Sequence, residues 1–322
     1  MARVLSHRLC GRARFGRRHG ERDLRKEVRD GARDPALVRD QYEDFWRDVL
    51  GSARKIVAAE PTSLARAVNL CVAAAAARPR KERRLRGRRI AALLAGRALP
   101  PVLSQRCMAA IARIAITDLV LGCCDADTKR IIELGSGWGT NLFYLWLGGA
   151  PRSADYVAME YTEAGRAATQ LLAGTEPALS MTVRPFDYHH PDLSEFRGND
   201  KTVIFTSHSI EQITTLSERL FSELLAIPGL HRVVHVEPVS WQLLDQRPIG
   251  PLVGALSRVV PPRLSLELDV RRRNRSTAYN QDLVGKLRGL EQAGRIRIER
   301  IAKNYVGANP LNPGTAIVWR PA

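Results

Sequence analysis

The chain has 322 residues, 45% of them hydrophobic, which is enough for one sizeable α/β domain with an extension, or for two domains. Its net charge is +17, yet residues 1–89 hold 24 Lys and Arg against 11 Asp and Glu, whereas residues 90–322 hold 26 against 22. The basic character is therefore an N-terminal property, and it does not mark the whole protein as a nucleic-acid binder.

The five cysteines show neither a C-x-x-C pair nor a Cys/His ligand spacing. That pattern is typical of a reducing cytoplasm and predicts no metal site. No apolar run approaches the roughly 18 residues of a membrane span, and the first residues lack the apolar core of a signal peptide. We therefore expect a cytoplasmic protein without a membrane partner and with an oligomeric state that the sequence leaves open.

Residues 1–34 are rich in Arg and Gly and have little apolar periodicity, which predicts a disordered or loosely helical basic tail. The alternative is an arm that binds nucleic acid or an acidic partner. From Pro35 the pattern becomes helical, because apolar residues recur three or four positions apart from Val38 to Leu50. The aromatic residues of this stretch are interpreted as core residues rather than as ligand contacts.

Further helices are predicted after Ser63, over 90–99 and over 104–122. Between them lies the basic block 78–89, which is interpreted as a solvated segment or, alternatively, as a phosphate-binding one. Residues 35–125 are therefore expected to form a helical region that precedes an α/β domain over residues 126–322.

The α/β domain is predicted to begin with one βαβ unit. A short apolar strand ends in Glu133-Leu134, a glycine-rich turn leads to a helix from Leu142, and a second strand ends on Glu160. Glycines permit positive φ and a close approach of a ligand to the main chain, and the following helix offers unpaired N–H groups. A carboxylate at the second strand end accepts ribose hydroxyls. The unit predicts a nucleoside-containing cofactor.

The spacing of the glycines in the turn narrows the choice of cofactor. Thr140 stands where a dinucleotide fingerprint has its third glycine, and the pattern from Glu133 to Gly139 is E-x-G-x-G-x-G. This resembles motif I of the class I S-adenosylmethionine-dependent methyltransferases, the alternative being a glycine turn in another α/β protein. The resemblance implies S-adenosylmethionine as cofactor, with Glu133 near its methionine end, Glu160 on the ribose and Tyr161 near the adenine. The turn residues expected to contact it are Gly135, Ser136, Gly137, Gly139 and Asn141.

A third strand is predicted over 181–184, with Asp187 and Tyr188 following it. The resemblance places Asp187 on the adenine amino group and Tyr188 beside it, whereas the alternative is a simple turn. The adjacent histidines at 189 and 190 are interpreted as a surface loop, since a metal site needs a third ligand that spacing does not show.

The fourth strand, 202–206, leads into Ser207 and His208. Ligands of open α/β sheets bind beyond the carboxyl ends of the strands, near the point where strand order reverses. We therefore predict His208 as a general base, Glu211 as its orienting or substrate-binding partner, and Ser207 as a cofactor contact. The alternative is a histidine that is bonded to backbone at a strand end.

The fifth strand, 231–236, ends at Glu237, and Trp241 follows shortly afterwards. Both are predicted to line the acceptor site, with a loop acid and a packed indole as the alternatives. A helix over 283–293 and two strands joined by a hairpin, 295–301 and 315–319, close the domain. The expected fold is α/β, a Rossmann-like seven-stranded methyltransferase sheet with helices on both faces, and the resemblance covers about residues 125–320. In similar methyltransferases a preceding helical region often covers the active site and shapes the substrate pocket, so the resemblance implies a cap or substrate-binding role for residues 35–125.

The function expected from the resemblance is methyl transfer to oxygen or nitrogen of a small-molecule or peptide-like acceptor of natural-product type. One alternative is an RNA methyltransferase anchored by the basic N-terminal region. Neither the N/D-P-P-Y/F tetrapeptide of nucleic-acid amino methylators nor a Pro-Cys nucleophile is present, which disfavours that alternative. Another alternative is a non-catalytic scaffold that keeps the fold and binds the cofactor.

Overall fold

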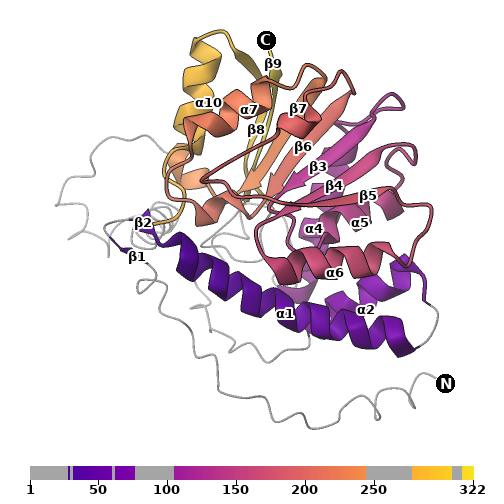
Figure 1. The fold of residues 1–322 in the computed structure, drawn as a ribbon. Coiled ribbons are helices and arrows are strands. Elements are labelled where there is room, and N and C mark those ends of the chain that lie inside the picture. The colour runs from indigo at the N-terminus through magenta and orange to yellow at the C-terminus, as the bar shows by residue number, and fades with distance from the viewer. Residues whose placement is uncertain (1–27, 30–31, 60–61, 77–104, 244–277, 307–313) are drawn as a thin grey trace.

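The structure is a computed structural model, and it describes residues 28–29, 32–59, 62–76, 105–243, 278–306 and 314–322 (Figure 1). Most of the predicted basic tail lies outside the described residues. The basic block 78–89, the predicted helix 90–99 and the loop-like stretch 250–275 lie outside them as well.

Seven strands form one mixed sheet, in the spatial order β5-β4-β3-β6-β7-β9-β8. The first five of these are parallel, and β9 is antiparallel to both of its neighbours. The predicted seven-stranded sheet with its closing hairpin is therefore confirmed. The strands are β3 (Arg130–Leu134), β4 (Asp155–Glu160), β5 (Met181–Pro185), β6 (Thr202–Ser207), β7 (Leu230–Glu237), β8 (Ile296–Val306) and β9 (Gly314–Pro321).

Strand register aligns the ends of the three central strands. Leu134 pairs with Met159 of β4 on one side and with Thr206 of β6 on the other. After β3 the chain adds β4 and β5 on one side, then returns to add β6 and β7 on the other. The order reverses between β3 and β6, which is the position where open α/β sheets bind ligands.

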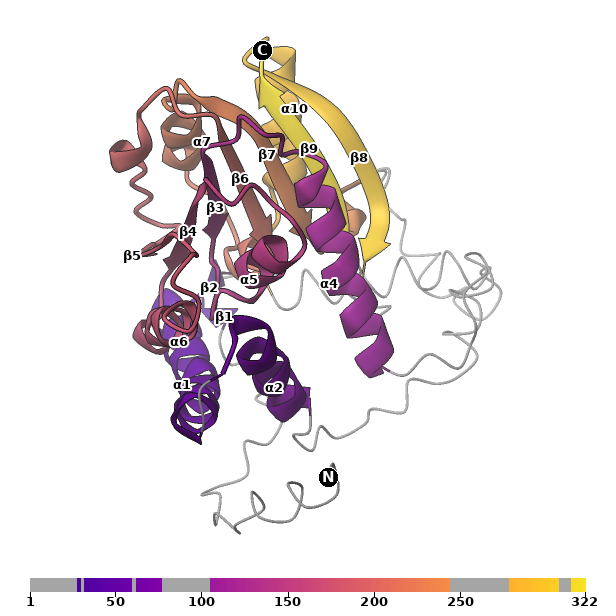
Figure 2. The ribbon, with the colours of Figure 1, turned by 90° about the vertical axis from the view of Figure 1, so that its right-hand side faces the viewer.

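Helices cover both faces of the sheet, as predicted (Figures 1 and 2). One face carries α4 (Gln105–Leu121), α5 (Thr140–Leu147) and α6 (Glu163–Ala173), with α1 (Pro35–Ala59) and α2 (Leu64–Ala76) packed outside them. The other carries α7 (Glu218–Leu225) and α10 (Leu283–Gln292). Three 3₁₀ turns, η2 (Ser194–Phe196), η3 (Ile210–Gln212) and η4 (Ser240–Leu243), and the short pair β1 (Val28–Arg29) and β2 (Ala32–Arg33) complete the described elements.

Strand residues alternate between two buried cores. Ile131 and Phe205 face the core under α4, α5 and α6, whereas Ile132 and Ile204 face the core under α7 and α10. Both sets are fully buried, which is why the central strands read as continuous apolar runs. Across the part of the chain that is described, no helix combines the length and apolarity needed to span a membrane.

The N-terminal helices share a core with the sheet. Val49 of α1, Leu64 of α2 and Ile116 of α4 belong to the same buried cluster as Ile131 of β3. The amide of Arg66 donates to Ser63 Oγ at 3.4 Å, which confirms the predicted cap of α2. α1 begins at Pro35 as predicted and runs on to Ala59, packed along α6.

Candidate active site

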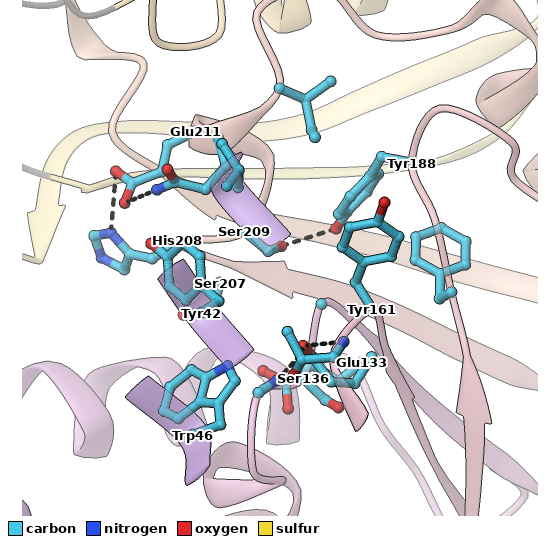
Figure 3. A pocket seen from close by; sticks show the side chains of 18 of the residues that line it. Tyr42, Trp46, Glu133, Ser136, Tyr161, Tyr188, Ser207, His208, Ser209 and Glu211 are labelled. Atoms are coloured by element: carbon cyan, nitrogen blue, oxygen red, sulfur yellow. Dashed lines mark hydrogen bonds and ion pairs between the residues drawn. The ribbon is translucent and has the colours of Figure 1, made fainter. Parts of the chain in front are cut away.

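A cavity of about 360 Å³ lies at the carboxyl ends of β3, β4 and β6 (Figure 3). Its floor is the glycine turn after β3 and the turn after β6, and α1 closes it from the side. Of the fifteen residues predicted for the site, twelve line this cavity. They are Glu133, Gly135, Ser136, Gly137, Asn141, Glu160, Tyr161, Asp187, Tyr188, Ser207, His208 and Glu211, with Gly139 in the same turn.

The three glycines of the turn are required by backbone shape and by space. Gly135, Gly137 and Gly139 have φ of 72°, 58° and 75°, a region that side chains rarely allow. A Cβ on Gly137 would lie 2.8 Å from the ring of Trp46, and one on Gly135 would lie 2.4 Å from Ser209 Cβ. The turn is thus pressed against both α1 and the turn after β6.

Glu133 presents a half-satisfied carboxylate to the cavity. One of its oxygens accepts from Asn141 Nδ2 at 2.6 Å, and the other has no partner among the described residues. The side chain is only 1% exposed, and burial raises the pKa of Glu133 well above its ordinary value. Ser136 Oγ, also buried at the cavity, likewise lacks a partner within the described chain. Two polar atoms of the wall are therefore available to a ligand.

Glu160 ties the second strand to the glycine turn. Its Oε2 accepts from the Gly137 amide at 2.8 Å, and its Oε1 accepts from the amide and hydroxyl of Thr162 at 3.0 and 2.6 Å. Burial raises the pKa of Glu160, and these hydrogen bonds oppose that shift. Because a carboxylate oxygen accepts two donors, Oε2 keeps room for one ligand hydroxyl. Next to Glu160, the Arg39 guanidinium stacks over the Tyr161 ring, with its Cζ 5.4 Å from the ring centroid.

The residues after β5 are held by local bonds. Asp187 accepts from the His189 amide at 2.8 Å and lies 3.1 Å from His190 Nδ1. The hydroxyls of Tyr188 and Ser209 are 2.8 Å apart, and each lies 2.9 Å from the carbonyl oxygen of Leu134. Tyr188 therefore fastens the ends of three strands together as well as lining the cavity. Within the described residues no group of His, Cys, Asp and Glu is arranged to hold a metal ion.

His208 occupies a strained backbone position at the edge of the cavity. Its φ is 54°, uncommon for a residue other than glycine, and its amide donates to the carbonyl of Val236 at 3.1 Å. The imidazole Nδ1 lies 3.9 Å from Glu211 Oε2, and 37% of the side chain is exposed. Burial lowers the pKa of His208, but its interaction with Glu211 and the charges of Glu211 and Glu237 outweigh that effect, so the net direction is upward.

Glu211 lines the cavity next to His208, as predicted, and its Oε1 accepts from Gln212 Nε2 at 2.8 Å. Glu237 and Trp241, in contrast, do not line it where the described residues form the wall. Glu237 is fully buried under the turn after β6, where it accepts from the Ser209 and Glu211 amides at 3.2 and 3.3 Å. Trp241 is buried in η4. The Glu237 carboxylate is thus committed to internal hydrogen bonds, and an acceptor contact of Trp241 stays a prediction.

The sequence did not single out which residues of α1 reach the cavity. Val38, Arg39, Tyr42 and Trp46 line the cavity, although periodicity predicts Val38, Tyr42 and Trp46 as core residues. The Glu43 carboxylate accepts from the first amides of α6, those of Glu163 at 2.8 Å and Ala164 at 3.1 Å. Amphipathic spacing identifies the inner face of a helix but not whether that face meets a core or a cavity, so no sequence signal distinguished the two.

No family model matches this chain, and no curated protein sequence matches it either. Solved structures with related folds include the mitomycin 7-O-methyltransferase MmcR (17% identity, TM-score 0.40) and the pyocyanin biosynthetic protein PhzM (17%, 0.41). These matches cover 68% and 67% of this chain but only 56% and 57% of those proteins. The magnesium protoporphyrin IX methyltransferase ChlM from Synechocystis PCC 6803, with bound SAH, matches 90% of this chain and 100% of its own at 10% identity and TM-score 0.43. At these scores the likenesses establish neither an activity nor an acceptor.

Proposed function

We propose that the chain, a protein with the class I methyltransferase fold, transfers a methyl group from S-adenosylmethionine to oxygen or nitrogen of a small-molecule or peptide-like acceptor. The observation that carries this proposal is the single cavity at the strand-order reversal. It brings the left-handed glycine turn and the buried acids Glu133 and Glu160 together with the His208–Glu211 pair.

The charge of the cavity favours a cationic cofactor. Glu133, Glu160 and Glu211 line it, and the carboxyl of Glu237 lies directly beneath. A dinucleotide would bring a doubly negative pyrophosphate to this turn, whereas S-adenosylmethionine carries a sulfonium and an ammonium group. Opposite charges attract more strongly in a buried site than in water, so the acids oppose the first ligand and support the second.

The residues present fit that cofactor. The unpartnered oxygen of Glu133 suits an ammonium donor, and Ser136 Oγ suits a nearby polar group. Glu160 Oε2, which holds one amide, suits a ribose hydroxyl. Gly137 lines the cavity with main chain alone, and the Trp46 ring of α1 packs against it. Tyr161 and Asp187 border the same cavity on the side expected for the adenine.

The chain's own chemistry is proton removal and alignment. S-adenosylmethionine supplies an electrophilic methyl group when bound. Because Nδ1 of His208 faces Glu211, the Nε2 atom is the one that accepts a proton from the acceptor's hydroxyl or amine. The Glu211 carboxylate stabilises the imidazolium so formed, and the wall residues align the acceptor for in-line displacement.

The preference for a small acceptor rests on the wall that α1 contributes. Val38, Tyr42 and Ile213 give the cavity an apolar and aromatic side, and Trp46 stands directly over the glycine turn. A concave site with an apolar wall of this kind suits a compact acceptor. The basic tail and the basic block 78–89 lie outside the described residues, and no described feature favours RNA.

Calorimetric titration of the purified chain with S-adenosylmethionine, and separately with NAD, tests the cofactor. We expect binding of the first alone and its loss in Gly137→Arg, whose side chain would fill the approach to the turn. Transfer of labelled methyl groups to a panel of hydroxylated and amino acceptors then tests the activity. Binding of neither ligand would overturn the proposal, and binding without transfer to any acceptor would favour the scaffold alternative.

A further inference from the structure

Behind the His208 turn lies a row of buried polar side chains that the cavity does not use. Trp319 of β9, His235 and Glu237 of β7, and Thr206 of β6 are each at most 1% exposed. Strand register explains the row. Thr206 pairs with His235, and Glu237 follows two residues later on the same face of β7. Trp319 sits diagonally across from His235, since its own partner is Val233.

The hydrogen bonds of this row have only one consistent direction. The Trp319 indole has a donor and no acceptor, so its 3.0 Å bond to His235 makes Nε2 the acceptor. Burial lowers the pKa of His235 to about 3, so the ring is neutral and carries its proton on Nδ1. That N–H donates to Thr206 Oγ1 at 3.1 Å. The Thr206 hydroxyl, whose oxygen accepts that bond, keeps its own hydrogen for Glu237, whose pKa it lowers.

Glu237 stands where this row ends and the His208 turn begins. Glu237 accepts from the amides of Ser209 and Glu211, one residue and three residues beyond His208. The left-handed backbone of His208 is unfavourable for this residue type and persists only where its surroundings fix it. The carboxylate of Glu237 fixes it from below, since it holds the amides on the C-terminal side of His208.

We propose that Trp319, His235 and Thr206 form a positioning network that orients Glu237, and that Glu237 in turn holds the His208–Glu211 turn in its working geometry. This inference rests on the proposed function insofar as it takes His208 for the general base. None of the four residues lines the cavity, so they are positioning residues rather than catalytic ones.

The balance at Glu237 is close enough for one hydrogen bond to matter. Burial raises its pKa to about 7 and the Glu211 charge adds to that, whereas His208, Thr206 and the Ser209 amide lower it. Other groups around the turn are Tyr42 of α1, Arg33 of β2 and Tyr279, all of which interact with one another near Glu211. Loss of the Thr206 hydroxyl would therefore raise the pKa of Glu237 further and weaken a negative charge that raises the pKa of His208.

The test is the Thr206→Val variant, which removes the hydroxyl with little change of shape. The matched control is Thr202→Val, because Thr202 is equally buried on the same strand and bonds Asp200 O at 2.7 Å at the other end. The pKa of His208 is measured by NMR titration of its 15N-labelled ring, whose signals are assigned with the His208→Gln variant. This measurement reports on the network without cofactor or acceptor. We expect the titration to move to lower pH in Thr206→Val and to stay in place in Thr202→Val and Thr206→Ser.

Turnover should fall roughly tenfold or more in Thr206→Val, with cofactor affinity retained, because a displaced base loses alignment. Should that variant fail to fold, Glu237→Gln removes the same charge and is expected to move the His208 titration in the same direction. An unmoved titration in either folded variant, or an equal movement in Thr202→Val, would overturn the network. If the His208 titration moves in Thr206→Val but the wild-type chain methylates no acceptor, the proposed activity is refuted while the network is supported.

Discussion

Replacing Glu133 with glutamine should weaken cofactor binding and stabilise the empty fold at the same time. Its carboxylate is 1% exposed, holds a single hydrogen bond from Asn141, and leaves one oxygen without a partner in the described chain. A buried polar group in this state costs about 1–3 kcal/mol, and glutamine removes the charge while its amide nitrogen stays unpaired. We therefore expect a gain near the lower limit, about 1 kcal/mol.

The gain should depend on pH with a definite sign. Burial raises the pKa of Glu133, so the folded state holds this proton more tightly than the unfolded chain does. The carboxyl thus destabilises the fold increasingly as pH rises above its ordinary value of 4.5. Glu133→Gln should raise the melting temperature at pH 7 by a few degrees, and the difference should vanish toward pH 4.

Binding should change in the opposite direction. A hydrogen bond between an ammonium group and a carboxylate contributes about 1.5–3 kcal/mol, so its loss predicts roughly tenfold to hundredfold weaker S-adenosylmethionine binding by calorimetry. Glu223→Gln is the matched control. Glu223 is also a buried carboxylate, but it does not line the cavity, and it forms an ion pair with Arg197 at 3.0 Å. That variant should lose stability and keep affinity. Wild-type affinity in Glu133→Gln, or destabilisation like that of the control, would refute the reasoning.

Three further changes test the rest of the site. Gly137→Ala should lower the free energy of unfolding by about 1–3 kcal/mol in chemical denaturation, because Gly137 has a positive φ and its added Cβ would contact Trp46. In a Trp46→Ala background the same change should cost less. His208→Gln should cut turnover roughly 10²- to 10⁴-fold with unchanged cofactor affinity, and normal turnover would remove His208 as the base. Glu43→Ala should speed hydrogen exchange at the first amides of α6 and cost about 1 kcal/mol, and unchanged exchange would contradict the contact between α1 and α6.

The sequence by itself determined the sheet and the floor of the cavity. Apolar runs bounded by turns located every strand of the sheet, and the chain order of those strands, with the acids after two of them, placed the glycine turn and Glu160 at one edge. These features depend on local spacing and on the rule that parallel strands end at the same edge. For that reason Glu133, Glu160 and His208 were found before any contact was known.

Only the tertiary structure decided what each side chain meets. Glu237 and Trp241 follow the strand edge as predicted, yet both are buried and neither lines the cavity, and the Glu237 carboxylate lies beneath the His208 turn. A residue at a strand end can face either the cavity or the interior. For the same reason the sequence could not show which α1 side chains reach the cavity. Tyr42 and Trp46 have the spacing of core residues but border the cavity. The hydrogen bonds from Trp319 through His235 to Thr206 join residues that are far apart in the chain. Their direction depends on strand register and tautomer, neither of which is encoded in local sequence.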